Sequence, residues 1–340
     1  MYQLPLSLKH KFFYLALIDN HGREVTYLRL AVTDRCNLRC FYCMPEEGID
    51  YVKRKELLSY EEMVRLVTTL VDLGIKKLRI TGGEPFLRKD MMRFLTMVST
   101  LGLEQINITT NGTLTLPYVP KLKKLGIHSV NLSLDTLSED RFFQITRRDS
   151  FEKVIKTFHA LVDTGIRTKI NMVVMEGKND LDLIEMARLA KKYPVDVRFI
   201  EEMPFNGSGR SSDLVWNHMR IFDKLKAEFP DINRKEMKPG ATAVTYEVPG
   251  FAGDLGIIAA YSRTFCGTCN RLRITPQGMI RTCLYDEGIF NIRDLMRSGA
   301  SDLQLKEAVL QAIGQRAKDG FEAEKLRFNQ ASESMSTIGG

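Results

Sequence analysis

The six cysteines of this 340-residue chain fall into two compact groups, and their spacing constrains the chain more than any other feature. The first group has the pattern C-x3-C-x2-C and consists of Cys36, Cys40 and Cys43. The second has the pattern C-x2-C-x13-C and consists of Cys266, Cys269 and Cys283. No export signal precedes them, so we expect a reducing compartment in which clustered thiols form metal sites rather than disulfides.

Two kinds of metal site fit three clustered thiols. A structural zinc ion normally takes four protein ligands, and none of the five histidines lies within the local spacing of either group. A distant histidine could still complete such a site, so zinc stays an alternative. An iron–sulfur cluster is normally held by cysteine thiolates, and a four-iron cluster on three of them keeps one iron open for another ligand.

Composition and charge narrow the class of protein. A chain with 44% hydrophobic and 27% charged residues is an ordinary globular mixture, which excludes disordered, collagen-like and coiled-coil proteins. The net charge of +7 favours an anionic ligand over a wrapped nucleic acid. No apolar run approaches the roughly 20 residues that span a bilayer, and the short apolar stretch at 12–18 lacks the cationic start of a signal peptide. We therefore expect a cytoplasmic protein that binds neither membrane nor nucleic acid.

Strand and helix patterns alternate six times in the first 200 residues. The strand patterns lie at 28–33, 77–81, 105–109, 128–134, 168–174 and 196–200. Ser59 and Glu62 form a capping box before the first helical pattern, which ends at Gly74. Such alternation predicts an α/β fold with right-handed βαβ units and a parallel sheet, curved into a partial (βα)6 TIM-type barrel. Ligands bind at the carboxyl ends of the strands in such folds.

The alternation fails after about residue 205, which indicates a smaller C-terminal domain. Residues 243–248 and 255–260 alternate like antiparallel strands, and the second cysteine group lies in the same region. We therefore divide the chain into an N-terminal extension at residues 1–21, a partial barrel at residues 22–205 and a C-terminal region at residues 206–340.

Several motifs resemble those of a known family. The C-x3-C-x2-C pattern after a first strand, with Tyr42 before the third cysteine, is the signature of the radical S-adenosylmethionine (SAM) superfamily, and GGEP at 82–85 resembles its GGE motif. The segments TDRCNLRCFYCMP at 33–45 and RITGGEP at 79–85 resemble the GTP 3′,8-cyclase family of molybdenum cofactor biosynthesis. So do the second cysteine group, with CNRLR at 269–273, and the terminal Gly339-Gly340.

The resemblance implies a radical enzyme with two [4Fe-4S] clusters, one on each cysteine group. The open iron of the first cluster would chelate SAM, whose one-electron cleavage yields a 5′-deoxyadenosyl radical. This radical would take hydrogen from C3′ of GTP, and the carbon would attack C8 to form (8S)-3′,8-cyclo-7,8-dihydroguanosine 5′-triphosphate. The second open iron would bind the guanine. An electron donor and a downstream cyclic pyranopterin monophosphate synthase are the implied partners, and a homodimer stays open.

The resemblance and the residue chemistry together assign the site residues. The residues expected to contact SAM are Tyr42, Gly83, Ser133 and Met203. The residues expected to contact GTP are Arg29, Arg79, Thr109, Lys169, Arg198, Arg271, Leu272 and Arg273, and Arg271 and Arg273 would also assist catalysis. GTP carries about four negative charges near neutral pH, which arginine and lysine side chains neutralise. Lys169 interrupts an otherwise apolar strand, which is costly unless it faces a polar cavity.

Two other functions fit part of the pattern. A radical enzyme that modifies a peptide or a sulfatase would share the first cysteine group, but its C-terminal extension usually carries more than three cysteines. A zinc- and nucleic-acid-binding module would purify with zinc and without the brown colour of iron–sulfur clusters.

Overall fold

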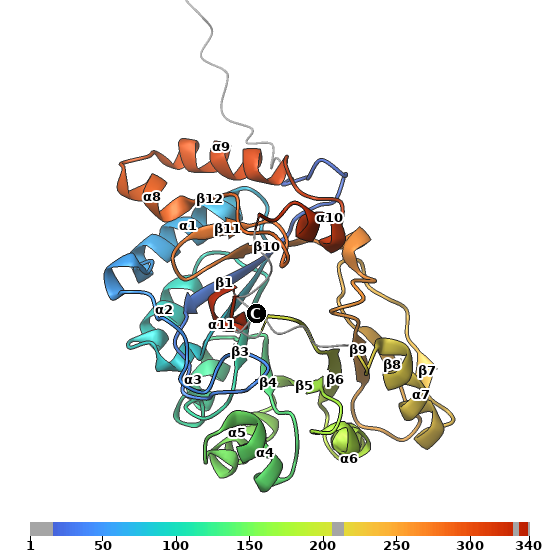
Figure 1. Ribbon diagram of the computed structural model, residues 1–340. Coiled ribbons are helices and arrows are strands. Elements are labelled where there is room, and N and C mark those ends of the chain that lie inside the picture. Colours follow the sequence, from blue (N-terminus) through green and yellow to red (C-terminus); the bar gives the residue numbers. More distant parts are fainter. Residues whose placement is uncertain (1–15, 206–213, 329–332, 339–340) are drawn as a thin grey trace, which may run out of the picture.

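The predicted strands form the centre of one continuous sheet. The computed structural model describes residues 16–205, 214–328 and 333–338, and within these ranges twelve strands form one sheet in the order β12-β11-β10-β1-β2-β3-β4-β5-β6-β9-β8-β7 (Figure 1). The central strands are β1 (Tyr27–Thr33), β2 (Lys77–Gly82), β3 (Gln105–Thr110), β4 (Ser129–Ser133), β5 (Arg167–Val174) and β6 (Asp196–Glu201). All neighbours among these six are parallel, which confirms the predicted sheet.

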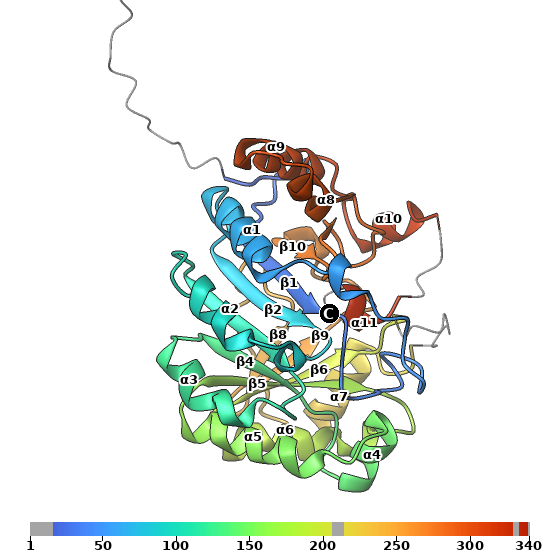
Figure 2. The same ribbon diagram turned by 90° about the vertical axis from the view of Figure 1, so that its left-hand side faces the viewer.

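Helices cover the outer face of the central strands, which curve around the middle of the molecule (Figures 1 and 2). These helices are α1 (Tyr60–Asp72), α2 (Met91–Val98), α3 (Val119–Lys124), α4 (Glu139–Thr146), α5 (Phe151–Asp163) and α6 (Leu183–Lys192). Short 3-10 helices lie at Arg54–Glu56, Pro85–Leu87, Leu116–Tyr118, Asp180–Asp182 and Cys266–Thr268. The predicted capping box begins α1, because Ser59 Oγ accepts the Glu62 N–H at 3.1 Å and Glu62 Oε2 accepts the Ser59 N–H at 2.7 Å.

The strands alternate between two faces of different chemistry. In β2, Leu78 and Ile80 are fully buried in the core beneath the helices, whereas Lys77, Arg79 and Thr81 line an interior cavity. Because successive strand side chains point to opposite faces, the same alternation repeats along the other central strands. The inner face of the sheet is therefore polar, and the apolar core lies between sheet and helices.

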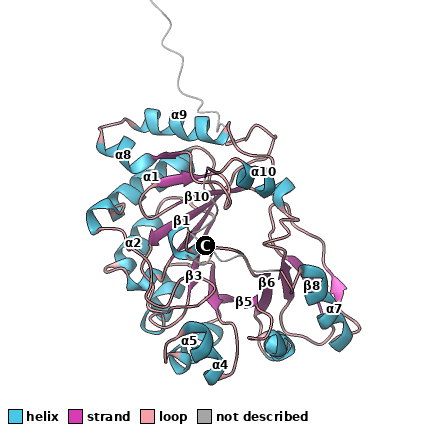
Figure 3. Ribbon diagram, in the orientation of Figure 1, coloured by secondary structure: helices cyan, strands magenta, loops and turns pink. Residues whose placement is uncertain are grey.

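The C-terminal region differs from the expected separate domain, because its strands extend both edges of the same sheet (Figure 3). Two of its strands continue the parallel order: β9 (Leu255–Ile258) pairs with β6, and β10 (Arg271–Ile274) pairs with β1. The outer strands β7 (Asn233–Arg234), β8 (Val244–Glu247), β11 (Met279–Arg281) and β12 (Phe290–Asn291) are antiparallel to their inner neighbours. The β8–β9 pair is the predicted antiparallel pair. The helices of the C-terminal region are α7 (His218–Glu228), α8 (Ile292–Arg297), α9 (Asp302–Ile313), α10 (Gly320–Lys325) and α11 (Met335–Ile338).

The last residues of the expected N-terminal extension pack onto the body of the protein. Residues 1–15 lie outside the described residues, but Leu17 is fully buried and the side chain of Asp19 is inaccessible to solvent. The segment before β1 is thus part of the fold from residue 17 onward. Among the described residues, no helix combines the length and apolarity needed to cross a membrane.

Candidate active site between the two cysteine groups

The two cysteine groups lie at opposite ends of the inner face of the sheet. Cys36 follows the carboxyl end of β1 by three residues, whereas Cys269 precedes β10, which runs parallel to β1 with Arg271 opposite Tyr27. The antiparallel strand β11 returns Cys283 to the start of β10. With about 3.3 Å per strand residue, the length of β1 separates the two groups by about 20 Å.

One cavity of about 760 Å³ connects the two groups, and all six cysteines line it. Its volume lies in the range of pockets that enclose small-molecule ligands and cofactors. The predicted site residues that line it are Arg29, Tyr42, Arg79, Gly83, Thr109, Ser133, Lys169, Arg198, Met203, Arg271 and Arg273. The structure thus brings together predicted residues from seven strands and from the loops that follow three of them.

Two thiols of the first group have neutral hydrogen-bond partners. Asn111 Nδ2 donates to Cys36 Sγ at 3.6 Å, and Ser334 Oγ lies 3.6 Å from Cys43 Sγ. Burial raises the pKa of Cys36 to about 12 and the pKa of Cys40 well above its usual value. Thiols in such a site become thiolates when a metal replaces their protons.

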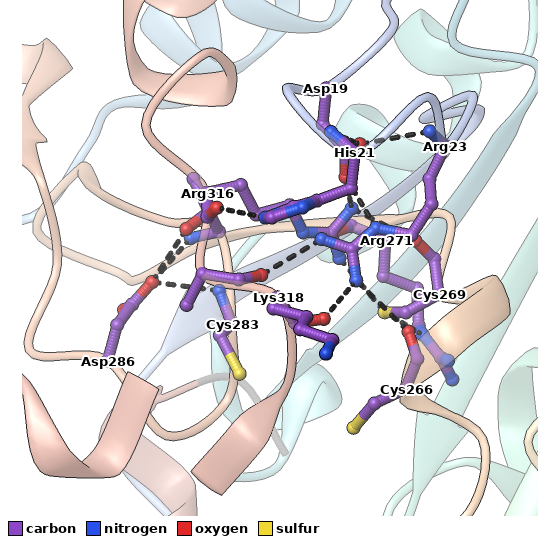
Figure 4. Close-up of polar contacts among 12 residues, drawn as sticks. Asp19, His21, Arg23, Cys266, Cys269, Arg271, Cys283, Asp286, Arg316 and Lys318 are labelled. Atoms are coloured by element: carbon purple, nitrogen blue, oxygen red, sulfur yellow. Dashed lines mark hydrogen bonds and ion pairs between the residues drawn. The ribbon is translucent and has the colours of Figure 1, made fainter. Parts of the chain in front are cut away.

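The second group has a cationic environment (Figure 4). Arg316 Nη2 donates to Cys269 Sγ at 2.9 Å, and Arg271 Nε donates to the same sulfur at 3.4 Å. Although burial opposes ionisation, the charges of Arg271 and Arg316 lower the pKa of Cys269 to about 6. Burial raises the pKa of Cys283 to about 11. The two groups therefore differ in the charge that they place beside sulfur.

The donor sets fit iron–sulfur clusters better than single metal ions. Among the described residues, no three His, Cys, Asp or Glu side chains converge closely enough to hold one ion. A tetrahedral zinc site requires such convergence. In a four-iron cluster each thiolate binds a different iron, so the three sulfurs surround a larger volume. Each cysteine group offers the three thiols that such a cluster takes, and all six cysteines line the cavity.

Three of the predicted cations lie side by side across neighbouring strands. Arg273 on β10, Arg29 on β1 and Arg79 on β2 occupy the same level of the sheet. Arg79 donates from Nε to the Tyr27 hydroxyl at 2.5 Å and from Nη1 to Thr109 Oγ1 at 3.2 Å. Adjacent strands are about 4.8 Å apart, so this row concentrates positive charge on one wall of the cavity.

Burial and repulsion between like charges disfavour the charged forms of Arg29, Lys169, Arg198 and Arg273. Burial and the neighbouring arginines lower the pKa of Arg273 and of Arg198 to about 10 and the pKa of Arg29 well below its usual value. Burial also lowers the pKa of Lys169 to about 8, although its Nζ lies 2.8 Å from Asp196 Oδ2. An anionic ligand in the cavity would relieve this repulsion.

The residues predicted to contact SAM lie at the first cysteine group or on the strand ends beside it. The Tyr42 hydroxyl donates to Asp135 Oδ2 at 2.8 Å. A Cβ on Gly83 would lie 2.1 Å from the carbonyl oxygen of Arg35, in the loop that carries the first cysteines. Glycine is therefore required here by the approach of this loop, a reason that the sequence did not indicate.

Leu272 is separated from the other predicted GTP residues. It lies between Arg271 and Arg273 on β10, so its side chain points to the opposite face, where it is fully buried in the apolar core. Only the backbone of Leu272 can contact a ligand in the cavity. The predicted Gly339-Gly340 lies outside the described residues, and α11, just before it, packs against β1 and β2.

Several cavity residues were not predicted from the sequence. Tyr27, Asn107, Asn131 and Asn171 line the cavity, and Oδ1 of Asn131 and of Asn171 is buried without a hydrogen-bond partner among the described residues. Such buried polar atoms indicate a ligand or water in the cavity. The signal that identifies them is a polar residue at every second position of a buried strand.

Two family models match the chain in succession. The Radical SAM superfamily model matches residues 30–190, and the Molybdenum Cofactor Synthesis C model matches residues 195–321. The division between them lies near the point where the strand–helix alternation ends.

Several curated relatives are about 40% identical to this chain over most of its length. The mitochondrial GTP 3′,8-cyclase of Arabidopsis thaliana is 40% identical over 87% of this chain and 77% of its own length. The GTP 3′,8-cyclase of Clostridium perfringens is 39% identical over 87% of this chain and 91% of its own length. Human molybdenum cofactor biosynthesis protein 1 is 39% identical over 89% of this chain, which spans only 48% of that longer protein. The chain thus spans about half the length of several relatives that it matches.

Solved structures share the fold at low identity. Streptococcus suis SuiB superimposes with a TM-score of 0.65 at 15% identity, over 92% of this chain and 77% of its own. Native anSMEcpe with bound AdoMet superimposes with a TM-score of 0.55 at 16% identity, over 89% of this chain and 84% of its own. These structures support the fold of this chain and carry no information on its substrate.

Proposed function

The chain belongs to the GTP 3′,8-cyclase family of the radical SAM superfamily, and we propose that it converts GTP to (8S)-3′,8-cyclo-7,8-dihydroguanosine 5′-triphosphate in molybdenum cofactor biosynthesis. The observation that carries this proposal is the row of interior cations between two sets of three thiols. A triphosphate would place its negative charge beside this row of arginines, and each set of three thiols would leave one iron of a cluster open.

The first cysteine group would hold a [4Fe-4S] cluster with SAM on its open iron. When bound, this pair supplies the 5′-deoxyadenosyl radical that takes hydrogen from C3′ of GTP, so that this carbon can attack C8. The chain holds and orients the reactants. In this proposal Gly83 keeps the cysteine loop close to β2, Tyr42 and Ser133 offer polar contacts to SAM, and Met203 offers an apolar one.

The inner face of the sheet would bind GTP. Arg29, Arg79 and Arg273 form the charged wall, and Lys169 and Arg198 face the cavity from β5 and β6. Arginine binds phosphate oxygens in a two-point geometry that fixes the orientation of the nucleotide. The remaining predicted contacts are Thr109, which is hydrogen-bonded to Arg79, the backbone of Leu272, and Arg271, which would also assist catalysis beside the second group.

The second cysteine group would hold a second [4Fe-4S] cluster, whose open iron binds the guanine. In this arrangement residues 22–205 form an open partial (βα)6 barrel, and residues 206–340 close its other end with the second cluster. With its phosphates among the arginines and its base near Cys269, the nucleotide would lie along the cavity between the two clusters. The proposal also includes an electron donor and a downstream cyclic pyranopterin monophosphate synthase.

The decisive experiment combines anaerobic metal analysis with turnover. We expect about eight irons per chain and consumption of GTP when SAM and a reductant are added. Release of deoxyadenosine without loss of GTP would favour a peptide- or sulfatase-modifying enzyme, and zinc in place of iron would refute both radical assignments. Cys36→Ala should abolish SAM cleavage, whereas Cys36→Ala protein that still cleaves SAM would contradict the role of the first group.

A further inference from the structure

Arg316 is buried against the second cysteine group (Figure 4). Its side chain is 3% exposed. Nη2 donates to Cys269 Sγ at 2.9 Å and to the Arg271 carbonyl oxygen at 3.1 Å, and Nη1 donates to the Cys269 carbonyl oxygen at 2.9 Å. One guanidinium thus holds both a ligand sulfur and the backbone that carries it.

Asp19 fixes the orientation of this guanidinium. Its side chain is fully buried, and its Oδ2 lies 3.2 Å from Arg316 Nη1 and 2.7 Å from Arg23 Nε. Its Oδ1 accepts the backbone N–H groups of His21 and Arg23, each at 2.9 Å. A buried carboxylate with this many donors holds a single orientation, and it aims Arg316 at the sulfur.

The same N-terminal segment also ties down the loop of the second group. Arg23 Nη1 donates to the Cys266 carbonyl oxygen at 3.1 Å and to the Lys318 carbonyl oxygen at 2.6 Å. Arg23 Nη2 donates to the Ala317 carbonyl oxygen at 2.9 Å. Residues 19–23 therefore connect two segments that lie about 250 and 300 positions later in the chain.

We propose that Arg316, aimed by Asp19, is a positioning residue that fixes Cys269 as a ligand of the second cluster and raises the reduction potential of that cluster. The inference rests on the proposed function, since it requires a cluster on Cys266, Cys269 and Cys283. Reduction adds negative charge to a cluster, and a buried cationic donor on a ligand sulfur stabilises the reduced state more than the oxidised state. The first group differs, because Asn111 and Ser334 are neutral partners of its thiols.

The test measures the reduction potential of the second cluster alone. In full-length protein with Cys36, Cys40 and Cys43 replaced by alanine, an EPR-monitored redox titration reports only this cluster. Arg316→Gln should lower the ratio of reduced to oxidised cluster at least tenfold at a fixed potential, which is about 59 mV for a one-electron couple. Arg316→Lys, which keeps a charged donor, should stay closer to the parent. Arg65→Gln is the control, because Arg65 is paired with Asp302 at the surface and is 38% exposed.

The outcomes separate this role from a general loss of structure. A potential of Arg316→Gln equal to that of the parent would overturn the proposal, as would an equal fall in Arg316→Lys and Arg316→Gln. If Arg316→Gln does not retain about four irons per chain, the Arg316→Lys variant is measured instead. An iron content and a reduction potential close to those of the parent would support the positioning role of Arg316. An Arg316→Lys variant that recovers neither would overturn it. Absence of iron in the parent background would instead refute the second cluster itself.

Discussion

Replacement of Arg198 by methionine should stabilise the unliganded protein and weaken its binding of GTP. Arg198 lies on β6, opposite Asn171 on β5 and Gly256 on β9, and it faces the cavity. Burial and the nearby charge of Arg79 lower its pKa from 12.5 to about 10 in the folded protein, although Asp196 acts in the opposite direction. The fold therefore disfavours the charged form that exists at neutral pH.

The size of this effect follows from the two pKa values. At about 1.36 kcal/mol per pKa unit, the difference between 12.5 and about 10 corresponds to about 3 kcal/mol. Because the folded value is the lower one, the destabilisation is complete below pH 10 and disappears only as the pH rises toward 12.5. Methionine removes the charge but keeps an extended side chain, so the free energy of unfolding at pH 7 should rise by about 1–3 kcal/mol.

Binding should change in the opposite direction. Loss of one buried partner of a phosphate costs about 2–5 kcal/mol, which raises the Kd for GTP by about 30-fold or more. The assays are anaerobic urea denaturation without nucleotide and calorimetric titration with GTP. Arg188→Met is the matched control, because Arg188 is 58% exposed and pairs with Glu228 at the surface. A less stable unliganded Arg198→Met protein, or one with unchanged GTP affinity, would refute the reasoning.

Three further substitutions test other parts of the site. Gly83→Ala places Cβ 2.1 Å from the Arg35 carbonyl oxygen. We expect the free energy of unfolding to fall by about 1–3 kcal/mol and the iron content per chain to fall to about half. A full iron content would contradict the role of this close approach. Leu272→Ala should lower the free energy of unfolding by about 2–5 kcal/mol and leave GTP affinity in calorimetry unchanged; weaker binding at unchanged stability would place Leu272 in the site instead. Arg271→Ala should still release deoxyadenosine but stop cyclisation, and normal GTP cyclisation in a product assay would show that its assigned role is wrong.

The central strands were predictable because short strand patterns alternate with helical patterns whose ends are marked by glycines such as Gly74, Gly126 and Gly165. The pairing of β10 with β1 and of β9 with β6 was not, because nothing in the local sequence reports a neighbour that lies 58 to 244 residues away. For this reason the C-terminal region was expected as a separate domain, although its strands complete the same sheet.

The residues that line the cavity were predictable where a charged side chain interrupts an otherwise apolar strand. Arg29 and Lys169 stand out in this way, whereas Tyr27 and Asn131 on the same face are neutral and do not. Arg316 could not be predicted as a partner of Cys269, because the two residues are 47 positions apart and in different elements. Sequence patterns report which face a residue occupies, and long-range contacts decide what it meets there.

The length of β1 sets the distance between the two cysteine groups across the cavity, because the strand begins beside one group and ends beside the other. A residue inserted between Leu28 and Arg29 would reverse the inward and outward sides of every later position in the strand, so that Arg29 would point into the core and Leu30 into the cavity. The insertion would also increase the distance between the two cysteine groups by about 3.3 Å. Evolution and engineering can therefore vary the loops of this protein more freely than the seven residues of this strand.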